Sequence, residues 1–359
     1  MNEQTKPKQI PEFSNNQNRE SQNWKAGKNI GFIFRLIVTL LIIAYLAIKV
    51  NGSELLGQLN RANPYWLLVA CMLFGVVNVL AALRWWFLLQ VQEIHLSFRS
   101  LTAITFIGQF FNSFLFGAIG GDIIKAVYLQ KYAPHQKTHA TLSIIMDRVI
   151  GMLVLISASL VAMAWQFQHL LGDGKANSVM IALSFILGIG IVGGIVLLCF
   201  PFNKMPLGIR VLWNKIPHRH VLKLVISGFR QHGVALELTI ASLVVGIVLT
   251  AVLVAAGYCI GIGIGLTVSY LQMLVIMTVV ICAISLPISI GGHGVREGIF
   301  VIMFATFGLI HIDQKTGGGG EIVILFSLLF YLIPLVWSIV GGIVYLAFRH
   351  DYDLVTVSK

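Results

Sequence analysis

The stretch Pro287-Ile-Ser-Ile-Gly-Gly-His-Gly-Val-Arg-Glu297 lies inside an apolar part of the chain and breaks it. Its proline and glycines disfavour a continuous helix, and an arginine and a glutamate follow them directly. A second break, Gly117-Ala-Ile-Gly-Gly-Asp122, interrupts an earlier apolar run. Irregular backbone at membrane depth is tolerated only where protein or a water-filled cavity surrounds it. We therefore interpret 100–131 and 269–310 as two re-entrant helical hairpins.

The apolar character of the whole chain predicts an integral membrane protein. Its mean hydropathy is +0.86, 57% of its residues are hydrophobic and only 11% are charged, whereas soluble domains carry about 25% charged residues. A soluble fold of this composition would expose large apolar patches and aggregate. The net charge of +11 falls in short segments between apolar runs, so it indicates membrane topology, and we expect no nucleic-acid partner.

Six apolar windows reach the length of about 20 residues that a membrane-spanning helix needs. These windows are 30–49, 64–89, 141–166, 178–200, 235–260 and 322–348. Residues 1–29 are rich in Asn, Gln, Lys and Pro and are predicted to form a disordered tail. The predicted fold is an all-α polytopic membrane bundle of six full spans and two hairpins. Eight full spans are the alternative, because they would also place both termini on one side.

Basic residues orient this bundle. The segment 201–234 carries Lys204, Arg210, Lys215, Arg219, Lys223 and Arg230 and no acidic residue, which predicts a cytoplasmic position. The segments predicted inside are 1–29, 90–99, 131–140, 201–234 and 349–359. The loops predicted outside are 50–63, 167–177, 261–268 and 311–321. We expect a multi-pass protein of the cytoplasmic membrane of a bacterium or archaeon, with both termini inside.

The two breaks resemble each other and suggest an internal repeat. Ile119-Gly-Gly-Asp122 precedes Lys125, and Ile290-Gly-Gly-His293 precedes Arg296, 171 residues further on. The same offset carries the window 64–89 onto 235–260. The predicted halves, 30–166 and 178–348, would be inverted relative to each other, an architecture typical of transporters.

Charged residues in membrane segments are costly and usually mark functional sites. In the first hairpin, Gly120 and Gly121 would let a ligand approach the backbone, and a helix starting there would direct free N–H groups at an anion. Lys125 follows one turn later. Asp122 either contributes to this site or only caps the helix.

The second hairpin offers the same kind of site. Gly291 and Gly292 precede His293, which is either a ligand or a turn residue. Arg296 can hold a phosphate through two parallel hydrogen bonds, and Glu297 could neutralise the arginine or couple a proton. The alternative is an Arg296–Glu297 pair that only locks the hairpin.

Three further charges could join these sites. Asp147 and Arg148 are adjacent and must point to different sides of their helix, so each needs its own partner, for example Asp147 with Lys125. Arg84 stands beside Trp85 and Trp86, where it could contact a lipid headgroup or extend to the membrane interface.

These residues resemble the lysylphosphatidylglycerol synthase transmembrane-region family, also called flippase-like. The marks of that family are Gly121-Asp122 with a following cation, Asp147-Arg148, Leu83-Arg84-Trp85, and Pro287 through Glu297. The resemblance covers about 30–350. Lys125 and Asp147 stand where Arg and Glu are common in the family. Members that synthesise the aminoacylated lipid carry a large soluble aminoacyltransferase domain after the membrane part, and we expect no such domain within these 359 residues.

The resemblance implies translocation of an anionic, aminoacylated or isoprenoid-linked lipid rather than synthesis. Membrane lipids would be the partners, with a soluble synthase or a second copy of the chain as further candidates. A membrane-embedded transferase is an alternative, for which Glu297 and His293 are the only acid–base candidates. A non-catalytic partner of a soluble synthase is another. No metal or cofactor is predicted, because the chain lacks His-Glu-x-x-His and a phosphate-binding Gly-x-x-x-x-Gly-Lys-Ser/Thr loop.

Overall fold

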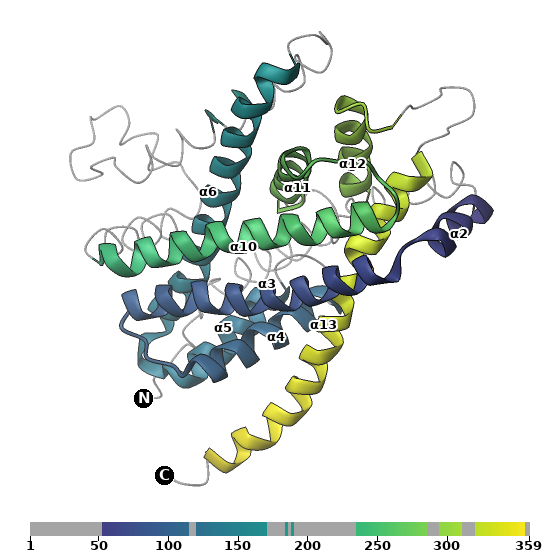
Figure 1. Cartoon of the computed structure of the whole chain (residues 1–359). Coiled ribbons are helices and arrows are strands. Elements are labelled where there is room, and N and C mark those ends of the chain that lie inside the picture. Colours follow the sequence, from purple (N-terminus) through teal and green to yellow (C-terminus); the bar gives the residue numbers. More distant parts are fainter. Residues whose placement is uncertain are drawn as a thin grey trace, which may run out of the picture.

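Every regular element in the described part of the chain is a helix. The computed structural model describes residues 52–114, 120–170, 184–185, 188–189, 235–285, 294–310 and 320–355. Its main helices are α2 (Gly52–Arg61), α3 (Pro64–Val91), α4 (Phe98–Phe114), α5 (Gly120–Tyr132), the 3-10 helix η1 (Pro134–Gln136), α6 (Lys137–Leu170), α10 (Leu236–Gly263), α11 (Tyr270–Ser285), α12 (Val295–Thr306) and α13 (Gly320–Val355). Figure 1 shows their arrangement. The prediction of an all-α membrane bundle is confirmed.

Within the described ranges, four helices are long and apolar enough to cross a membrane. They are the spans Pro64–Val91, Pro134–Trp165, Leu236–Gly263 and Gly320–Ala347, and they confirm four of the six predicted windows. The window 30–49 lies outside the described residues, and only residues 184, 185, 188 and 189 of the window 178–200 are described.

The helices of the two predicted hairpins are shorter. The first hairpin contains α4 and α5, with 17 and 13 residues, and the second contains α11 and α12, with 16 and 12. At 1.5 Å per residue these helices are about 18–26 Å long, less than the roughly 30 Å of a hydrocarbon core. Helix α12 begins at Val295, directly after Gly294, the last glycine of the second predicted break. Residues 115–119 and 286–293 lie outside the described residues, so the re-entrant course of both hairpins stays a prediction.

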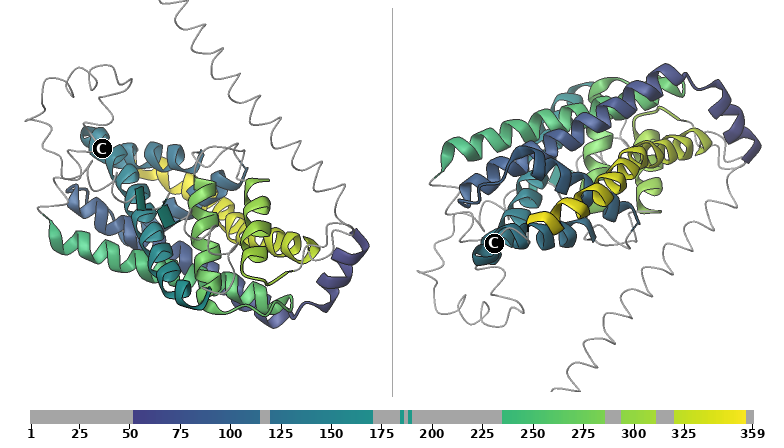
Figure 2. Two further views of the ribbon diagram at one scale, coloured as in Figure 1. Left: turned by 90° about the horizontal axis from the view of Figure 1, so that it is seen from above. Right: turned by 90° about the horizontal axis from the view of Figure 1, so that it is seen from below.

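Helices α3 and α10 run antiparallel, side by side in all three views, and lie along one side of the bundle (Figures 1 and 2). Asn63 caps α3 by accepting a hydrogen bond from the Tyr65 N–H at 3.0 Å, and Pro64 occupies the first helical position. The Asn63 N–H donates to the Gly263 carbonyl at 2.7 Å, which joins the start of α3 to the end of α10.

The contacts between helices follow the same pattern in the two predicted halves of the chain. Both α3 and α10 have 28 residues. Helix α13 packs on α4 as α6 packs on α11, and α6 contacts α5 and α10 as α13 contacts α12 and α3. This correspondence pairs α3, α4, α5 and α6 with α10, α11, α12 and α13, respectively. It supports the predicted inverted repeat.

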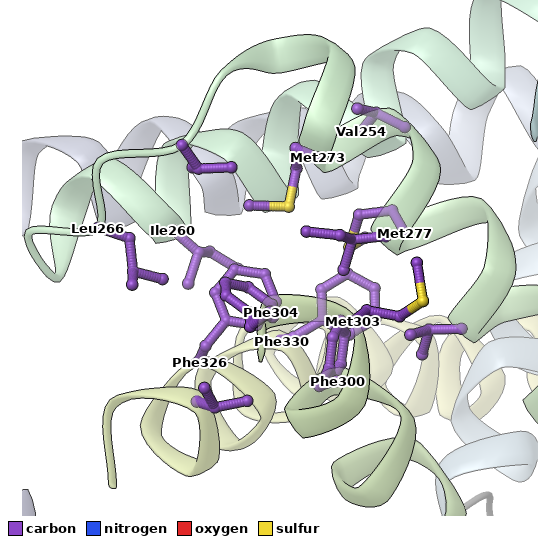
Figure 3. Close-up of a cluster of buried hydrophobic side chains, with 14 of the residues drawn as sticks. Val254, Ile260, Leu266, Met273, Met277, Phe300, Met303, Phe304, Phe326 and Phe330 are labelled. Atoms are coloured by element: carbon purple, nitrogen blue, oxygen red, sulfur yellow. The ribbon is translucent and has the colours of Figure 1, made fainter. Parts of the chain in front are cut away.

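A large apolar core joins α10, α11, α12 and α13 (Figure 3). Phe300 of α12 packs edge-to-face on Phe326 of α13, with ring centroids 5.0 Å apart, and Met273 and Met277 of α11 belong to the same core. A smaller cluster around Trp85 and Leu129 joins α3, α4, α5 and α6. These two cores fix the helices that carry the charged residues.

Candidate functional site

Two glycines let α4 and α5 approach closely beside Lys125. A Cβ at Gly121 would collide with the Gly108 carbonyl and would lie 2.7 Å from the Asn112 amide carbon. The sequence suggested that the Gly121 N–H would be free for a ligand. In the structure this N–H instead donates to the Asn112 Oδ1 at 2.8 Å. A Cβ at Gly108 would lie 2.8 Å from Cε of Lys125, so the lysine side chain rests against α4.

Asp147 and Arg148 form separate ion pairs with two different helices. The Arg84 Nε of α3 donates to the Asp147 Oδ1 at 2.7 Å, and the Arg148 Nε donates to the Asp122 Oδ2 of α5 at 2.8 Å. The adjacent charges therefore point to different sides of α6, as predicted. The residue that pairs with the first hairpin is Arg148, through Asp122, whereas the example suggested from the sequence, Asp147 with Lys125, is wrong because the two groups lie beyond 4.0 Å.

The structure places Asp122 inside its helix rather than at the cap, and it places Arg84 in an ion pair. Helix α5 begins at Gly120, so Asp122 lies within the first turn rather than at the cap, where its charge still favours the helix dipole. The Arg84 side chain is 12% exposed and is directed at Asp147 of α6. A Cβ at Gly151 would lie 2.9 Å from the Arg84 Nη1, and one at Gly246 would lie 3.6 Å from Cδ. The Arg84 guanidinium therefore packs against Gly151 of α6, and its aliphatic stem lies in contact distance of Gly246 of α10.

Lys125 differs from the other charges of this region because, in the part of the chain that the structure describes, its ammonium has no carboxylate within ion-pair distance. Its Nζ lies 5.0 Å from the centroid of the Trp85 ring, and no carboxylate of the described residues is within 4.0 Å of it. Trp85 is 1% exposed, and its indole N–H donates to the Ser143 Oγ at 3.2 Å, which fixes the ring.

The charged side chains around Lys125 make up one electrostatic unit. The charged groups in the described residues that act on Lys125 are Asp147, Asp122, Arg148 and Arg84. We call these five residues the α5 cluster. It contains three cations and two carboxylates.

Arg296 and Glu297 form a second group, which we call the α12 cluster. The Arg296 Nη2 donates to the Glu297 Oε1 at 2.6 Å, and the two residues are only 5% and 8% exposed. Ser327 of α13 accepts a hydrogen bond from the Arg296 Nε at 2.8 Å and donates to the Glu297 Oε1 at 2.9 Å. The Gly294 N–H donates to the other carboxylate oxygen at 2.5 Å. The cluster is neutral and locks the start of α12 to α13.

Arg296 and Glu297 are paired with each other, as in the alternative in which this pair only locks the hairpin. A contact of the α12 cluster with a substrate stays a prediction. Gly291, Gly292 and His293 lie outside the described residues. Within the described ranges, no three His, Cys, Asp or Glu side chains are grouped so that they could hold a metal ion.

Sequence reasoning named Trp85 only as a neighbour of Arg84, and it missed the other uncharged residues that position these charges. Trp85 and Ser143 orient the Lys125 side chain, Gly151 makes room for the Arg84 guanidinium, and Ser327 bridges the α12 cluster. One signal was available in the sequence. Gly151 follows Asp147 by four residues, which places both on one face of a helix.

Comparison with known proteins agrees with this membrane architecture. The sequence profile of the family described as "Lysylphosphatidylglycerol synthase TM region" matches residues 32–341. The chain is also 24% identical over 116 residues to a UPF0104 membrane protein of Methanocaldococcus jannaschii, and this alignment covers 32% of the chain and 34% of the relative. The chain thus aligns with about a third of that relative's length. Because the profile covers most of its residues, the chain belongs to the lysylphosphatidylglycerol synthase TM region family.

Proposed function

We propose that this multi-pass membrane protein is a lipid flippase, which moves an anionic, aminoacylated or isoprenoid-linked lipid between the leaflets of a cytoplasmic membrane. Its family supports a lipid-related function. The observation that carries the proposal is Lys125, a partly buried cation between apolar helices with no carboxylate within ion-pair distance in the described residues. A lipid phosphate is the anion most available at such a position.

The energetics of Lys125 favour an external anion. A charged side chain at the bilayer centre costs about 2.5–3.5 kcal/mol on insertion scales, whereas a cation–π contact contributes about 0.5–2 kcal/mol. The Trp85 ring therefore offsets only part of the cost. A phosphate oxygen would form a charge-assisted hydrogen bond to the ammonium.

The two ion pairs of the α5 cluster provide a frame for the passing headgroup. Arg84–Asp147 is the more buried pair and ties α3 to α6. The Arg148–Asp122 pair ties α6 to α5, and the Arg148 side chain is 42% exposed. In our proposal, Lys125 receives the phosphate while Arg148 meets it at the open side, and the acyl chains stay in lipid.

Reconstitution into liposomes tests this function directly. Leaflet exchange of labelled phosphatidylglycerol, lysyl-phosphatidylglycerol and a polyprenyl phosphate would be followed in vesicles with the folded protein, with heat-inactivated protein and without protein. We expect at least one lipid to exchange about tenfold faster with folded protein than in either control. Exchange of none of these lipids by monodisperse, correctly folded protein would contradict the proposal. Formation of a modified lipid by the purified protein would favour the transferase alternative instead.

A further inference from the structure

The two charged clusters have different charge balances. In the α12 cluster, one guanidinium meets one carboxylate, and both are buried in a complete network. In the α5 cluster, each carboxylate is paired with one arginine at 2.7–2.8 Å, and Lys125 is additional. Among the described residues, the α5 cluster therefore carries one net positive charge and the α12 cluster carries none.

The position of the additional charge is fixed by packing. Trp85 supports the ammonium, Ser143 holds the indole, and Gly108 lets the lysine stem lie against α4. The carboxylates of Asp122 and Asp147 are occupied by arginines. A ligand ammonium group would therefore be repelled by the net positive charge of the α5 cluster, whereas a ligand with one negative charge would neutralise the cluster.

We propose that the α5 cluster selects a ligand with one net negative charge, a phosphodiester whose other substituents are uncharged, over headgroups that are zwitterionic or positively charged. This inference rests on the proposed function for its lipid source and narrows the substrate class. A phosphatidylglycerol-like headgroup satisfies it. An aminoacylated headgroup does not, because its ammonium cancels or exceeds the phosphate charge.

A binding measurement tests the selection without transport. Thermal unfolding of the full chain in neutral detergent would be followed with short-chain phosphatidylglycerol, short-chain phosphatidylcholine, lysyl-phosphatidylglycerol and water-soluble glycerophosphoglycerol. We expect phosphatidylglycerol to raise the unfolding midpoint and the zwitterionic and cationic lipids to leave it unchanged. A shift with glycerophosphoglycerol as well would assign recognition to the phosphodiester alone. A shift with the lipid only would show that the acyl chains are also needed. Both results support the selection.

Variants of one helix supply the controls. Lys125→Gln should abolish the shift, and Lys125→Arg should retain it because the charge is kept. Lys131→Gln should also retain it, since Lys131 is an exposed lysine in the last turn of the same helix. Equal shifts with phosphatidylglycerol and phosphatidylcholine in the unsubstituted protein would overturn the inference, whether or not a variant folds. So would an undiminished shift in folded Lys125→Gln.

The exchange assay separates this inference from the proposed function. Exchange of all headgroups at equal rates would contradict the charge selection while leaving flippase activity intact. Selective binding of phosphatidylglycerol without exchange of any lipid would contradict the flippase and leave the charge selection standing.

Discussion

Arg84 shows how the surroundings of one residue decide its role. Its sequence position beside two tryptophans suits an interfacial arginine, but the structure holds its guanidinium between α6 and α10 and pairs it with Asp147. Breaking a buried ion pair by removing one partner is strongly destabilising, because the other charge is left uncompensated. We therefore assign Arg84 a positioning role in the α5 cluster.

A double-mutant cycle tests that assignment. Arg84→Ala and Asp147→Ala should each lower the free energy of unfolding by about 3 kcal/mol, since each leaves one charge without its partner. The double variant should lose less than the sum of the two. Thermal unfolding of the detergent-solubilised variants gives the comparison. Additive losses would show that the pair contributes no coupling.

We expect the main role of Glu297 to be structural. It accepts hydrogen bonds from Gly294, Arg296 and Ser327, so Glu297→Gln removes the charge that neutralises Arg296 and one acceptor oxygen. We expect a loss of about 3 kcal/mol in the free energy of unfolding. Ser327→Ala should cost about 1.5–3 kcal/mol, because the hydroxyl bonds two charged groups, Arg296 and Glu297, but both charges stay paired with each other. A Glu297→Gln variant with unchanged stability would contradict the locking role.

At the scale of single residues, the sequence identified which charged side chains lie in the site better than it identified the ion-pair partner of each. Charge in an apolar run is itself the signal, so Asp122, Lys125, Asp147 and Arg148 could be named without a structure. Which carboxylate meets which cation depends on the rotation of three helices about their axes. That rotation is set by small contacts such as Gly121 on Gly108, which charge patterns do not encode.

Close packing of α4 and α5 sets the position of Lys125 at the scale of elements. Gly121→Ala places a methyl group against the Gly108 carbonyl, and overpacking of this kind costs about 1–3 kcal/mol. We expect a loss of about 2 kcal/mol and weaker lipid binding as the helices separate. Gly298→Ala in α12 is the matched control, because a Cβ there meets no atom within 4 Å. Its higher helix propensity should leave stability equal or slightly raised. Equal effects of the two substitutions would refute the packing argument.

The elements themselves were largely predictable. Long apolar windows gave four of the spans, and the second glycine-rich break marked where α12 begins. Both features follow from local chemistry, since apolar length and helix-breaking residues act without knowledge of distant contacts. The packing of α13 on α4 and of α6 on α11 is a long-range property, and the inverted repeat was the only route to it from the sequence.

The whole molecule brings together loops that the charge distribution places on the same side. The segment 93–96 and the segment 132–136 line one cavity of about 360 Å³. At another place, Asn63 is hydrogen-bonded to Gly263, which joins two loops predicted outside. The structure is therefore compatible with the proposed orientation of the bundle.

Cysteine labelling tests that orientation. After replacement of Cys71, Cys199, Cys259 and Cys282, single cysteines would be introduced at His95, His135, Arg61 and Thr267, all exposed positions. A membrane-impermeant maleimide should label the first two only in inside-out vesicles and the last two in intact cells. Labelling of His95→Cys from outside would reverse the orientation. Labelling of His95→Cys and His135→Cys from opposite sides would contradict the paired loops.

Lys125, as the cation that binds a lipid phosphate, is the residue on which the proposed lipid transport depends most. The most direct measurement is the initial rate of phosphatidylglycerol exchange in liposomes that contain equal amounts of folded unsubstituted, Lys125→Gln or Lys131→Gln protein. We predict that Lys125→Gln lowers the protein-dependent rate at least about tenfold, equivalent to roughly 1.4 kcal/mol, and that Lys131→Gln leaves it unchanged. A Lys125→Gln protein that is folded and exchanges phosphatidylglycerol at the unsubstituted rate would contradict the account.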